Sequence, residues 1–290
     1  MINQENKYIA IKYVNNKFKF PIKLLCEIAN LQRSSYYKWL NRKTTKNFKE
    51  NELILKTIKE IHEENGSIYG YRRMTLNIAD RLGIKVNHKR VYRIMKENNL
   101  LSVIRRRRKY FYRKTTQQHV SENILNRKFY ANKPNEKWLT DVTEFKYGVN
   151  KKAYLSAIID LYDNSIVAYT VGHSNNNKLV FENLDLALKE LNGEKPLIHS
   201  DRGFQYTSHG FFWKINKYGL THSMSRVGRC LDNAPMEGFF GILKSEKYYL
   251  NKYKDYDTLK RDIENYINFY NNDRLQKKLD AKSPLAFRYS

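Results

Sequence analysis

Three acidic residues occur where a polar side chain needs an explanation. Asp141 interrupts the strand-like stretch WLTDVTEFKY, Asp201 follows an apolar run, and Glu237 lies in the first turns of an expected helix. Each has an ordinary structural role available to it: a strand-edge residue, a turn former, and a charge that is favourable at a helix N-terminus. Taken one at a time, these structural roles are the better interpretation.

The three acids considered together indicate a metal site. Asp141 precedes Asp201 by 60 residues, and 35 residues separate Asp201 from Glu237. Carboxylates on three different elements can hold two divalent cations roughly 3.5 to 4 Å apart, which activates an attacking oxygen and stabilises a leaving oxygen in phosphoryl transfer. Because Mg²⁺ prefers oxygen ligands, we expect these three acids to bind two Mg²⁺ or Mn²⁺ ions.

The elements that must position these acids are typical of an α/β core. Residues 138–147, 151–172 and 195–201 are rich in β-branched and aromatic residues and predict strands. Residues 179–193 have helical spacing and predict a helix that ends at Gly193. Further helices are expected over 234–250, opened by Asp232, Asn233 and Pro235, and over 256–275. The pattern predicts a mixed sheet with flanking helices.

The first hundred residues predict helices. Residues 22–40 predict two short helices around a break at Asn30, the second capped by Ser34 or Ser35, which is a helix-turn-helix shape.

A second helical region covers residues 53–100. Ile54, Ile58 and Ile61 have helical spacing, Asn87 is a candidate cap, and the helix after it has one apolar face. That face is formed by Val91, Ile94 and Met95.

Basic residues in this second region are candidates for DNA contact. They are Arg72, Arg73, Lys89, Arg90, Arg93 and Lys96. A solvated helix face is the alternative interpretation of the last four. The run RRRRKYFYRK follows, and its Arg105, Arg106, Arg107 and Arg108 fit an arm along a phosphate backbone or an ordinary linker.

The charge of the chain favours a polyanionic partner. Of its 290 residues, positions 1–133 hold 31 Lys and Arg against 10 Asp and Glu, while positions 134–290 hold 23 against 19. Nucleic acid is preferred to an anionic membrane, because no long amphipathic apolar stripe accompanies the basic residues. No apolar run is long enough for a membrane helix and no signal peptide is evident, so we expect a cytoplasmic protein.

We expect four segments along the chain. They are a helical helix-turn-helix-like segment at 1–50, a helix-turn-helix-like DNA-binding domain at 51–104, a basic linker at 105–133 and a catalytic core at 134–290. Cys26 and Cys230 are too few for a disulfide framework or a cysteine zinc site, so reduced thiols are expected.

Three blocks of this sequence resemble a known enzyme family. WLTDVTEF, HSDRGFQYTS and SMSRVGRCLDNAPMEGFFGILKSE resemble the catalytic blocks of the IS-three family of insertion-sequence transposases, relatives of retroviral integrases with a ribonuclease-H-like fold. The spacing from Asp201 to Glu237 matches the Asp-Asp-(35)-Glu pattern of that family. The helical front and YINFYNNDRLQKKLDAKSP resemble its other regions, so that the match covers most of the chain.

The resemblance implies an enzyme that cuts double-stranded DNA at the ends of its own element and joins the freed 3′ hydroxyl to another phosphodiester, with no covalent protein–DNA intermediate. Asp141, Asp201 and Glu237 would bind the metal, and Lys244, seven residues after Glu237, would bind DNA near the scissile phosphate. Joining two ends implies a homo-oligomer. Asp232 and Asn233 also match, and helix capping is their preferred interpretation; His199 is expected to be packed.

Two departures from the family pattern limit what can be transferred. Gln276 stands where the family usually has His, so no proton-transfer role is assigned there. The family commonly forms its full enzyme by fusion to an upstream reading frame that carries a leucine zipper, and sustained heptads do not occur here. We therefore expect fusion to, or association with, an upstream-frame product.

Other functions remain as alternatives at this stage. The 23 tyrosines invite a tyrosine recombinase, which would form a phosphotyrosine link to DNA. A structure-specific nuclease could use the same acids without joining strands. A DNA-binding repressor would bind element ends with no chemistry.

Overall fold

The computed structural model describes residues 4–42, 45–103, 120–227 and 230–290. By its contacts the chain divides into two compact units, Met1–Thr57 and Ile58–Ser290. We describe each unit by itself.

The first unit is a small helical body. It contains α1 (Gln4–Phe18), α2 (Ile22–Ile28), α3 (Arg33–Leu40) and the beginning of α4 (Lys46–Glu64). Its core consists of buried aromatic and aliphatic side chains with one free thiol: Tyr8, Ile11, Cys26 and Tyr36. The helix pair expected from residues 22–40 is confirmed.

The turn between α2 and α3 differs in detail from the expectation. Asn30 has a positive φ of 54°, which fits the expected break. However, α3 begins at Arg33 with Gln32 at the N-cap and no capping side-chain hydrogen bond. The prediction that Ser34 or Ser35 would cap this helix is therefore wrong; both lie inside its first turn.

The second unit begins with a helical segment. After the end of α4 come α5 (Tyr71–Leu82) and α6 (His88–Glu97). The side chain of Asn87 accepts a hydrogen bond from the Lys89 backbone N–H and so caps α6 as expected. The apolar residues expected on one face of these helices are buried in this unit: Ile58, Ile61, Val91, Ile94 and Met95. Ile54, in the part of α4 that belongs to the first unit, is buried as well.

A five-stranded mixed sheet forms the centre of the second unit. Its strands are β1 (Lys137–Tyr147), β2 (Lys151–Asp160), β3 (Ile166–Gly172), β4 (Leu197–Ser200) and β5 (Thr221–Met224). They lie in the order β3-β2-β1-β4-β5; the β1–β2 and β2–β3 pairs are antiparallel, and the β1–β4 and β4–β5 pairs are parallel. The expected mixed sheet is confirmed.

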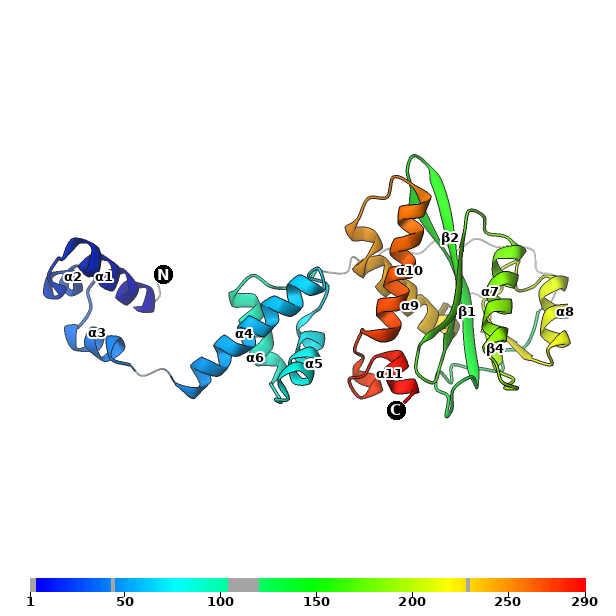
Figure 1. Ribbon diagram of the computed structural model, residues 1–290, viewed down its shortest axis with the longest axis horizontal. Coiled ribbons are helices and arrows are strands. Elements are labelled where there is room, and N and C mark those ends of the chain that lie inside the picture. Colours follow the sequence, from blue (N-terminus) through cyan, green and yellow to red (C-terminus); the bar gives the residue numbers. More distant parts are fainter. Residues whose placement is uncertain (1–3, 43–44, 104–119, 228–229) are drawn as a thin grey trace. The chain divides into compact units, whose positions relative to one another are not determined.

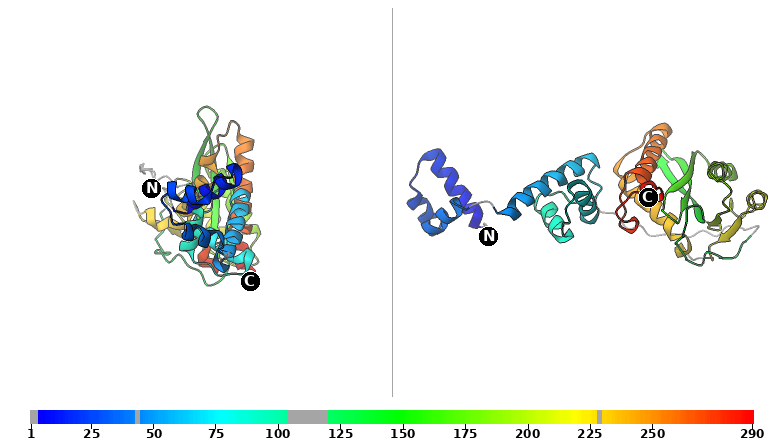
Figure 2. Two further views of the ribbon diagram at one scale, coloured as in Figure 1. Left: turned by 90° about the vertical axis from the view of Figure 1, so that its left-hand side faces the viewer. Right: turned by 60° about the horizontal axis from the view of Figure 1, so that its bottom comes forward.

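Helices cover both faces of this sheet (Figure 1). One face packs against α7 (Asn177–Lys189) and α8 (His209–Lys217), and the other against α9 (Ala234–Glu246) and α10 (Tyr256–Asn272). The same layering is visible in Figure 2 (right). Each face has its own core: Trp138 belongs to the first, and Leu139, the next residue of β1, to the second. This alternation is the period of two that a strand buried on both sides requires.

Two elements of the second unit were not predicted, and several helix ends were misplaced: α9 ends at Glu246 and α10 at Asn272, before the expected residues 250 and 275. Helix α8 and strand β5 have no counterpart among the elements expected from the sequence. Helix α7 ends at Lys189, four residues before Gly193. Short helical segments η1 (Cys230–Asn233), η2 (Tyr248–Leu250), η3 (Lys277–Leu279) and α11 (Pro284–Arg288) complete the unit.

The side chain of Arg288, in α11, closes a buried ion cluster. Its guanidinium donates to Asp160 Oδ2 at 3.1 Å and to Asp163 Oδ2 at 2.8 Å. Both carboxylates have no exposed surface, and Arg288 also donates to Asn135 and Ser165. The C-terminal helix thus neutralises two acids at the turn between β2 and β3.

No helix in the described ranges is long and apolar enough to cross a membrane.

Candidate active site

The sheet register brings Asp141 and Asp201 together. In the parallel β1–β4 pair, Thr140 lies opposite Ser200. The residue after each of these two is an aspartate, so Asp141 and Asp201 are neighbours where β4 ends. The strand runs from Leu197 to Ser200, within the expected range 195–201, and ends immediately before Asp201. This is the end of parallel strands at which α/β proteins usually place ligands.

Glu237 comes to the same place from α9. Pro235 occupies the first turn of this helix, where its missing N–H costs no hydrogen bond. The apolar residues Met236, Phe239, Phe240 and Leu243 are buried, and α9 packs against β1. Glu237 itself is half-buried. The structure therefore brings all three predicted acids close enough to interact electrostatically.

The protonation of the acids shows how unbalanced this charge is. Burial raises the pKa of Asp141 well above its usual range; the charges of Asp201 and then Glu237 raise it further, and Lys244 opposes them. Burial also raises the pKa of Asp201 and that of Glu237. Asp201 Oδ1 accepts from the Gly203 N–H at 2.8 Å, which partly compensates.

The chemistry of these side chains fits a divalent cation. Three carboxylates supply hard oxygen ligands, and their mutual repulsion would be relieved by positive charge. Within the described residues, however, no three His, Cys, Asp or Glu side chains are arranged to enclose a metal ion. Donor type and charge therefore fit, whereas a closed set of ligands would require the carboxylates to turn toward one another.

A buried tyrosine lies close to the two aspartates. The Tyr206 hydroxyl is 3.1 Å from Thr140 Oγ1, and the side chain is almost wholly buried. Burial first, and then the charges of Asp141 and Asp201, raise the pKa of Tyr206 well above its usual value. We did not assign a role to Tyr206 from the sequence, because its position close to the acids depends on the loop that folds back after β4.

His199 is packed, as expected. It is fully buried, with Nδ1 2.8 Å from Ser223 Oγ and Nε2 3.1 Å from Ser225 Oγ. Burial lowers its pKa to about 4, so the ring is neutral at physiological pH. Both ring nitrogens are occupied by serine hydroxyls, which leaves His199 a structural residue at the base of the site.

Lys244 lies on the side of α9 that faces β1. Its ammonium group donates to Thr143 Oγ1 and lies 5.0 Å from the centre of the Phe145 ring. Its positive charge lowers the pKa of Asp141. Lys244 is therefore within electrostatic range of the acids, on the helix that carries Glu237.

Asp232 and Asn233 do not cap α9 through their side chains, so that prediction is wrong. Asn233 is the N-cap residue, but its side chain makes no capping hydrogen bond. Its amide nitrogen and oxygen are both buried and have no hydrogen-bond partner within the described residues. Asp232 is fully buried and accepts hydrogen bonds from Arg226, Arg127 and Asn123 instead.

The predicted DNA-contacting residues of α5 and α6 are distributed unevenly. Arg72, Lys89 and Arg93 are exposed, whereas Arg90 is half-buried. Arg72 packs on Tyr71, and Arg93 forms an exposed ion pair with Glu97 at 3.8 Å. Arg105, Arg106, Arg107 and Arg108 lie outside the described residues.

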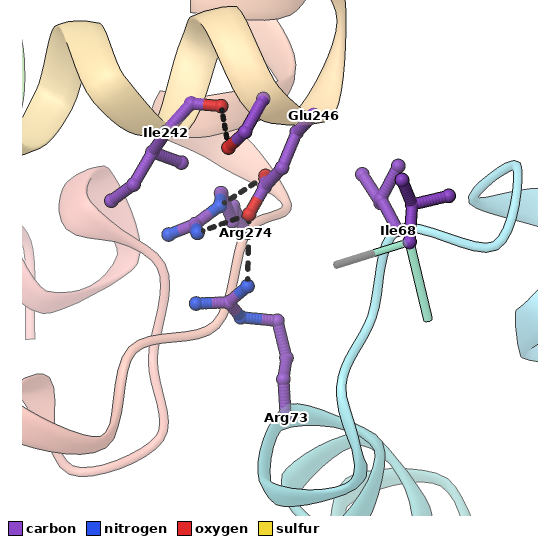
Figure 3. A pocket seen from close by; sticks show the side chains of 7 residues that line it. Ile68, Arg73, Ile242, Glu246 and Arg274 are labelled. Carbon is purple, nitrogen blue, oxygen red and sulfur yellow. Dashed lines mark hydrogen bonds and ion pairs between the residues drawn. The ribbon is translucent and has the colours of Figure 1, made fainter. Parts of the chain in front are cut away.

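Arg73 points into a pocket instead of toward open solvent (Figure 3). It donates to Glu246 Oε1 at 3.3 Å and to the Leu275 carbonyl at 3.2 Å. The same carboxylate accepts two hydrogen bonds from Arg274, at 2.9 and 2.7 Å, and one from the Tyr266 hydroxyl. Burial alone would raise the pKa of Glu246, but the hydrogen bonds and charges of its partners hold it below the usual value. We therefore do not include Arg73 in a DNA-binding surface.

The C-terminal signature is structural for the same reason. Arg274 is 3% exposed and its guanidinium is committed to Glu246. The amide nitrogen of Gln276 is buried and has no hydrogen-bond partner in the described part of the chain.

Models of known domains match three parts of the chain. Residues 49–108 match the model of an HTH-like domain, and residues 131–230 and 237–290 match two models of an integrase core domain. The catalytic core domain of HTLV-2 integrase, solved in complex with magnesium, has 21% identity and a TM-score of 0.43, covering 54% of this chain and 98% of that chain.

Two transposases resemble the chain along nearly its whole length. The transposase InsF for insertion sequence IS3A from Escherichia coli is 27% identical over 97% of this chain and 98% of that protein. The putative transposase InsK for IS150 from the same organism is 40% identical over 93% of this chain and 94% of that protein. With its mixed sheet and these relatives, the chain belongs to the IS-three family of insertion-sequence transposases, polynucleotidyl transferases with an integrase core of ribonuclease-H-like fold.

Proposed function

We propose that this transposase cleaves DNA at the ends of its own insertion sequence and transfers the freed 3′ hydroxyl to another phosphodiester. The observation that supports this is the convergence of Asp141, Asp201 and Glu237 from a strand, a strand end and a helix. Because the three carboxylates repel one another, binding of cations at this site is favourable. Water is the first nucleophile and the DNA 3′ hydroxyl the second, so no covalent protein–DNA intermediate forms.

The chain's own residues would hold and orient the reacting groups. Asp141, Asp201 and Glu237 would bind two Mg²⁺ or Mn²⁺ ions, which when bound supply the charge that activates the attacking oxygen and stabilises the leaving one. The hydrogen bond from the Gly203 N–H fixes the orientation of Asp201. The hydrogen-bonded side chains of Thr140 and Tyr206 pack close to both aspartates. Lys244, whose side chain contacts Thr143 on the strand that carries Asp141, would bind DNA near the scissile phosphate.

The rest of the chain would bring DNA to this site. The exposed cations Arg72, Lys89 and Arg93 would contact element-end DNA, with Arg90 at the edge of that surface. Residues 105–108 would follow the phosphate backbone. Because two ends must be joined, the active complex would be a homo-oligomer, together with an upstream-frame product, acting on cytoplasmic DNA at the nucleoid.

Strand cleavage and transfer test this function. Wild type and Asp201→Asn are compared on labelled duplexes that carry the terminal repeats flanking the gene, with Mg²⁺ or Mn²⁺ and with EDTA. We expect metal-dependent joined products from wild type and at least a hundredfold less from the variant, because one ligand is lost. Unchanged binding of the duplex by Asp201→Asn is the control for folding.

Other outcomes would identify the alternatives. Cleavage without joining would indicate a structure-specific nuclease on the same fold. Binding of the ends without any metal-dependent chemistry, both by this chain and by its fusion to an upstream-frame segment, would indicate a repressor. A trapped phosphotyrosine would contradict the proposal outright.

A further inference from the structure

Two arginines from distant parts of the chain meet on one buried carboxylate. Asp232 Oδ1 accepts from Arg127 Nε at 2.7 Å and from Arg226 Nη2 at 2.9 Å. Its Oδ2 accepts from Arg226 Nε and from the Arg226 backbone N–H, at 2.9 and 3.0 Å, and from Asn123 Nδ2 at 2.9 Å. We call Arg127, Arg226 and Asp232 the arginine clamp.

The clamp presents positive charge to solvent. Asp232 has no exposed surface, but the Arg127 and Arg226 side chains are 40% and 46% exposed. A guanidinium has five N–H donors, and the carboxylate takes one from Arg127 and two from Arg226. Within the described residues the side-chain hydrogen bonds of both guanidinium groups go to Asp232, and the remaining donors can take an anion. Two cations against one anion leave the clamp with a net charge of +1.

The exposure of both arginines distinguishes this cluster from the buried pair on Glu246. Arg226 alone already donates to both oxygens of Asp232, which is the geometry that satisfies a buried carboxylate. Arg127 adds a second guanidinium that stays 40% exposed, whereas the two arginines that share Glu246, Arg73 and Arg274, are only 23% and 3% exposed. The clamp therefore presents its excess charge at the surface, where a further anion can reach it. The backbone phosphate of DNA is such an anion, and it accepts hydrogen bonds from paired guanidinium groups.

The clamp adjoins the catalytic acids through the backbone. Arg226 follows Ser225, whose N–H donates to the Ser200 carbonyl at 2.9 Å, and Ser200 precedes Asp201. Arg202, on the other side of Asp201, donates to the Ser225 carbonyl at 2.7 Å. Asp232 lies in η1, immediately before α9 and five residues before Glu237. A phosphate on the clamp would therefore belong to a DNA strand passing the active site.

We propose that Arg127 and Arg226, held in place by Asp232, bind a backbone phosphate of the DNA that enters the active site. This inference rests on the proposed function, because it takes DNA as the substrate of the core. The buried aspartate acts as a positioning residue, and the arginines make the contact. The site is sequence-independent, since a phosphate carries no base information.

The salt dependence of DNA binding tests the contact. The full chain is titrated against a short fluorescein-labelled duplex of random sequence, in EDTA, over a range of salt concentrations. We expect Arg127→Ala and Arg226→Ala each to weaken binding roughly tenfold and to lower the slope of log K against log salt by about 1, because one phosphate contact is lost. Arg261→Ala removes an exposed arginine from α10 and is the matched control, with a change of less than about twofold.

Asp232→Asn separates the clamp from simple electrostatics. Removing an acid from a basic surface should tighten DNA binding if only net charge matters. The clamp requires the opposite, because the arginines lose the group that orients them, so we expect weaker binding. Thermal unfolding shows which variants are folded. Arg127→Ala keeps every bond between Arg226 and Asp232, so it remains informative if Asp232→Asn does not fold.

Two results would overturn the clamp. One is a salt slope for Arg127→Ala and Arg226→Ala equal to that of Arg261→Ala. The other is a folded Asp232→Asn variant that binds as tightly as wild type or more tightly. Neither depends on catalysis, so a failure of the strand-transfer assay leaves this test intact.

Discussion

At the scale of single residues, the active site consists of charges that are unfavourable for folding. Asp141 is half-buried beside two further carboxylates, and both burial and its neighbours raise its pKa. Ionising it at neutral pH therefore costs folding free energy, because the folded state binds its proton more tightly than the unfolded state does. Active sites commonly accept such a cost in exchange for function.

Asp141→Asn should stabilise the protein in the absence of metal. We expect the free energy of unfolding in EDTA at neutral pH to rise by about 1 kcal/mol, since the repulsion from Asp201 and Glu237 is removed. The gain should shrink as the pH falls through the raised pKa of Asp141, because wild type then becomes neutral at this position too. Urea unfolding of wild type and Asp141→Asn at several pH values, from neutral pH downward, measures the difference in their free energies of unfolding.

The matched control is Asp257→Asn, at an exposed acid in the first turn of α10. This substitution removes the same charge at a position outside the active site, so it should not stabilise the protein. A destabilised Asp141→Asn at neutral pH would show that the contacts of the Asp141 carboxylate outweigh its repulsion by the other two acids.

At the scale of elements, helix α9 is fixed at both ends by buried ions. Before its first residue, Asp232 accepts from two arginines, and in its last turn Glu246 accepts from two more. Between these anchors the helix carries Glu237 and Lys244. A helix held at its two ends places a catalytic side chain more accurately than packing alone.

Glu246→Gln should destabilise the second unit strongly. It leaves Arg274, which is 3% exposed, without its anionic partner, and breaking such a buried pair costs about 3 kcal/mol. Urea unfolding at neutral pH measures the loss. Glu264→Gln breaks an exposed pair with Lys260 on α10 and should change stability by less than about 0.5 kcal/mol. Equal effects of the two substitutions would refute the special role of Glu246.

The local elements could be predicted because their signals are local. The cap at Asn87, the apolar face of α6 and the strands around Asp141 all depend on neighbours in the sequence. Metal binding by Asp141, Asp201 and Glu237 could be proposed because residue type and spacing restrict the chemistry that these acids can do. The arginine clamp could not be predicted, because Arg127 and Asp232 are 105 residues apart and no local pattern in either segment indicates that they pair. Arg73 was assigned to DNA for the same reason, as its partner Glu246 is 173 residues away.

At the scale of the whole molecule, stability should depend on pH through the buried histidines of β4 and β5, His199 and His222. Burial, and then the charge of His199, lower the pKa of His222 to about 4 from its usual 6.5. His222 Nε2 is 3.0 Å from Ser200 Oγ. Between pH 6.5 and pH 4 the unfolded chain binds a proton that the folded chain refuses, so stability falls as the pH falls.

His222→Gln should reduce this dependence. In that window we expect the free energy of unfolding to fall less steeply than in wild type, by up to about 1.4 kcal/mol per pH unit. Urea unfolding at several pH values measures the slopes, and His209→Gln, at an exposed histidine of α8, should keep the wild-type slope. A His222→Gln slope equal to that of wild type would mean that His222 already titrates normally in the folded protein.

The ion cluster around Arg288 also sets an order of events during synthesis. Asp163 leaves the ribosome 125 residues before the arginine that neutralises it. Until then, burying Asp160 and Asp163 at the turn between β2 and β3 would leave both acids without their cationic partner. Closing this part of the sheet is therefore unfavourable before Arg288 is present. Folding of the catalytic core therefore depends on Arg288, and a nascent chain that stalls before this residue would hold the acids of the active site without the closed sheet that aligns them.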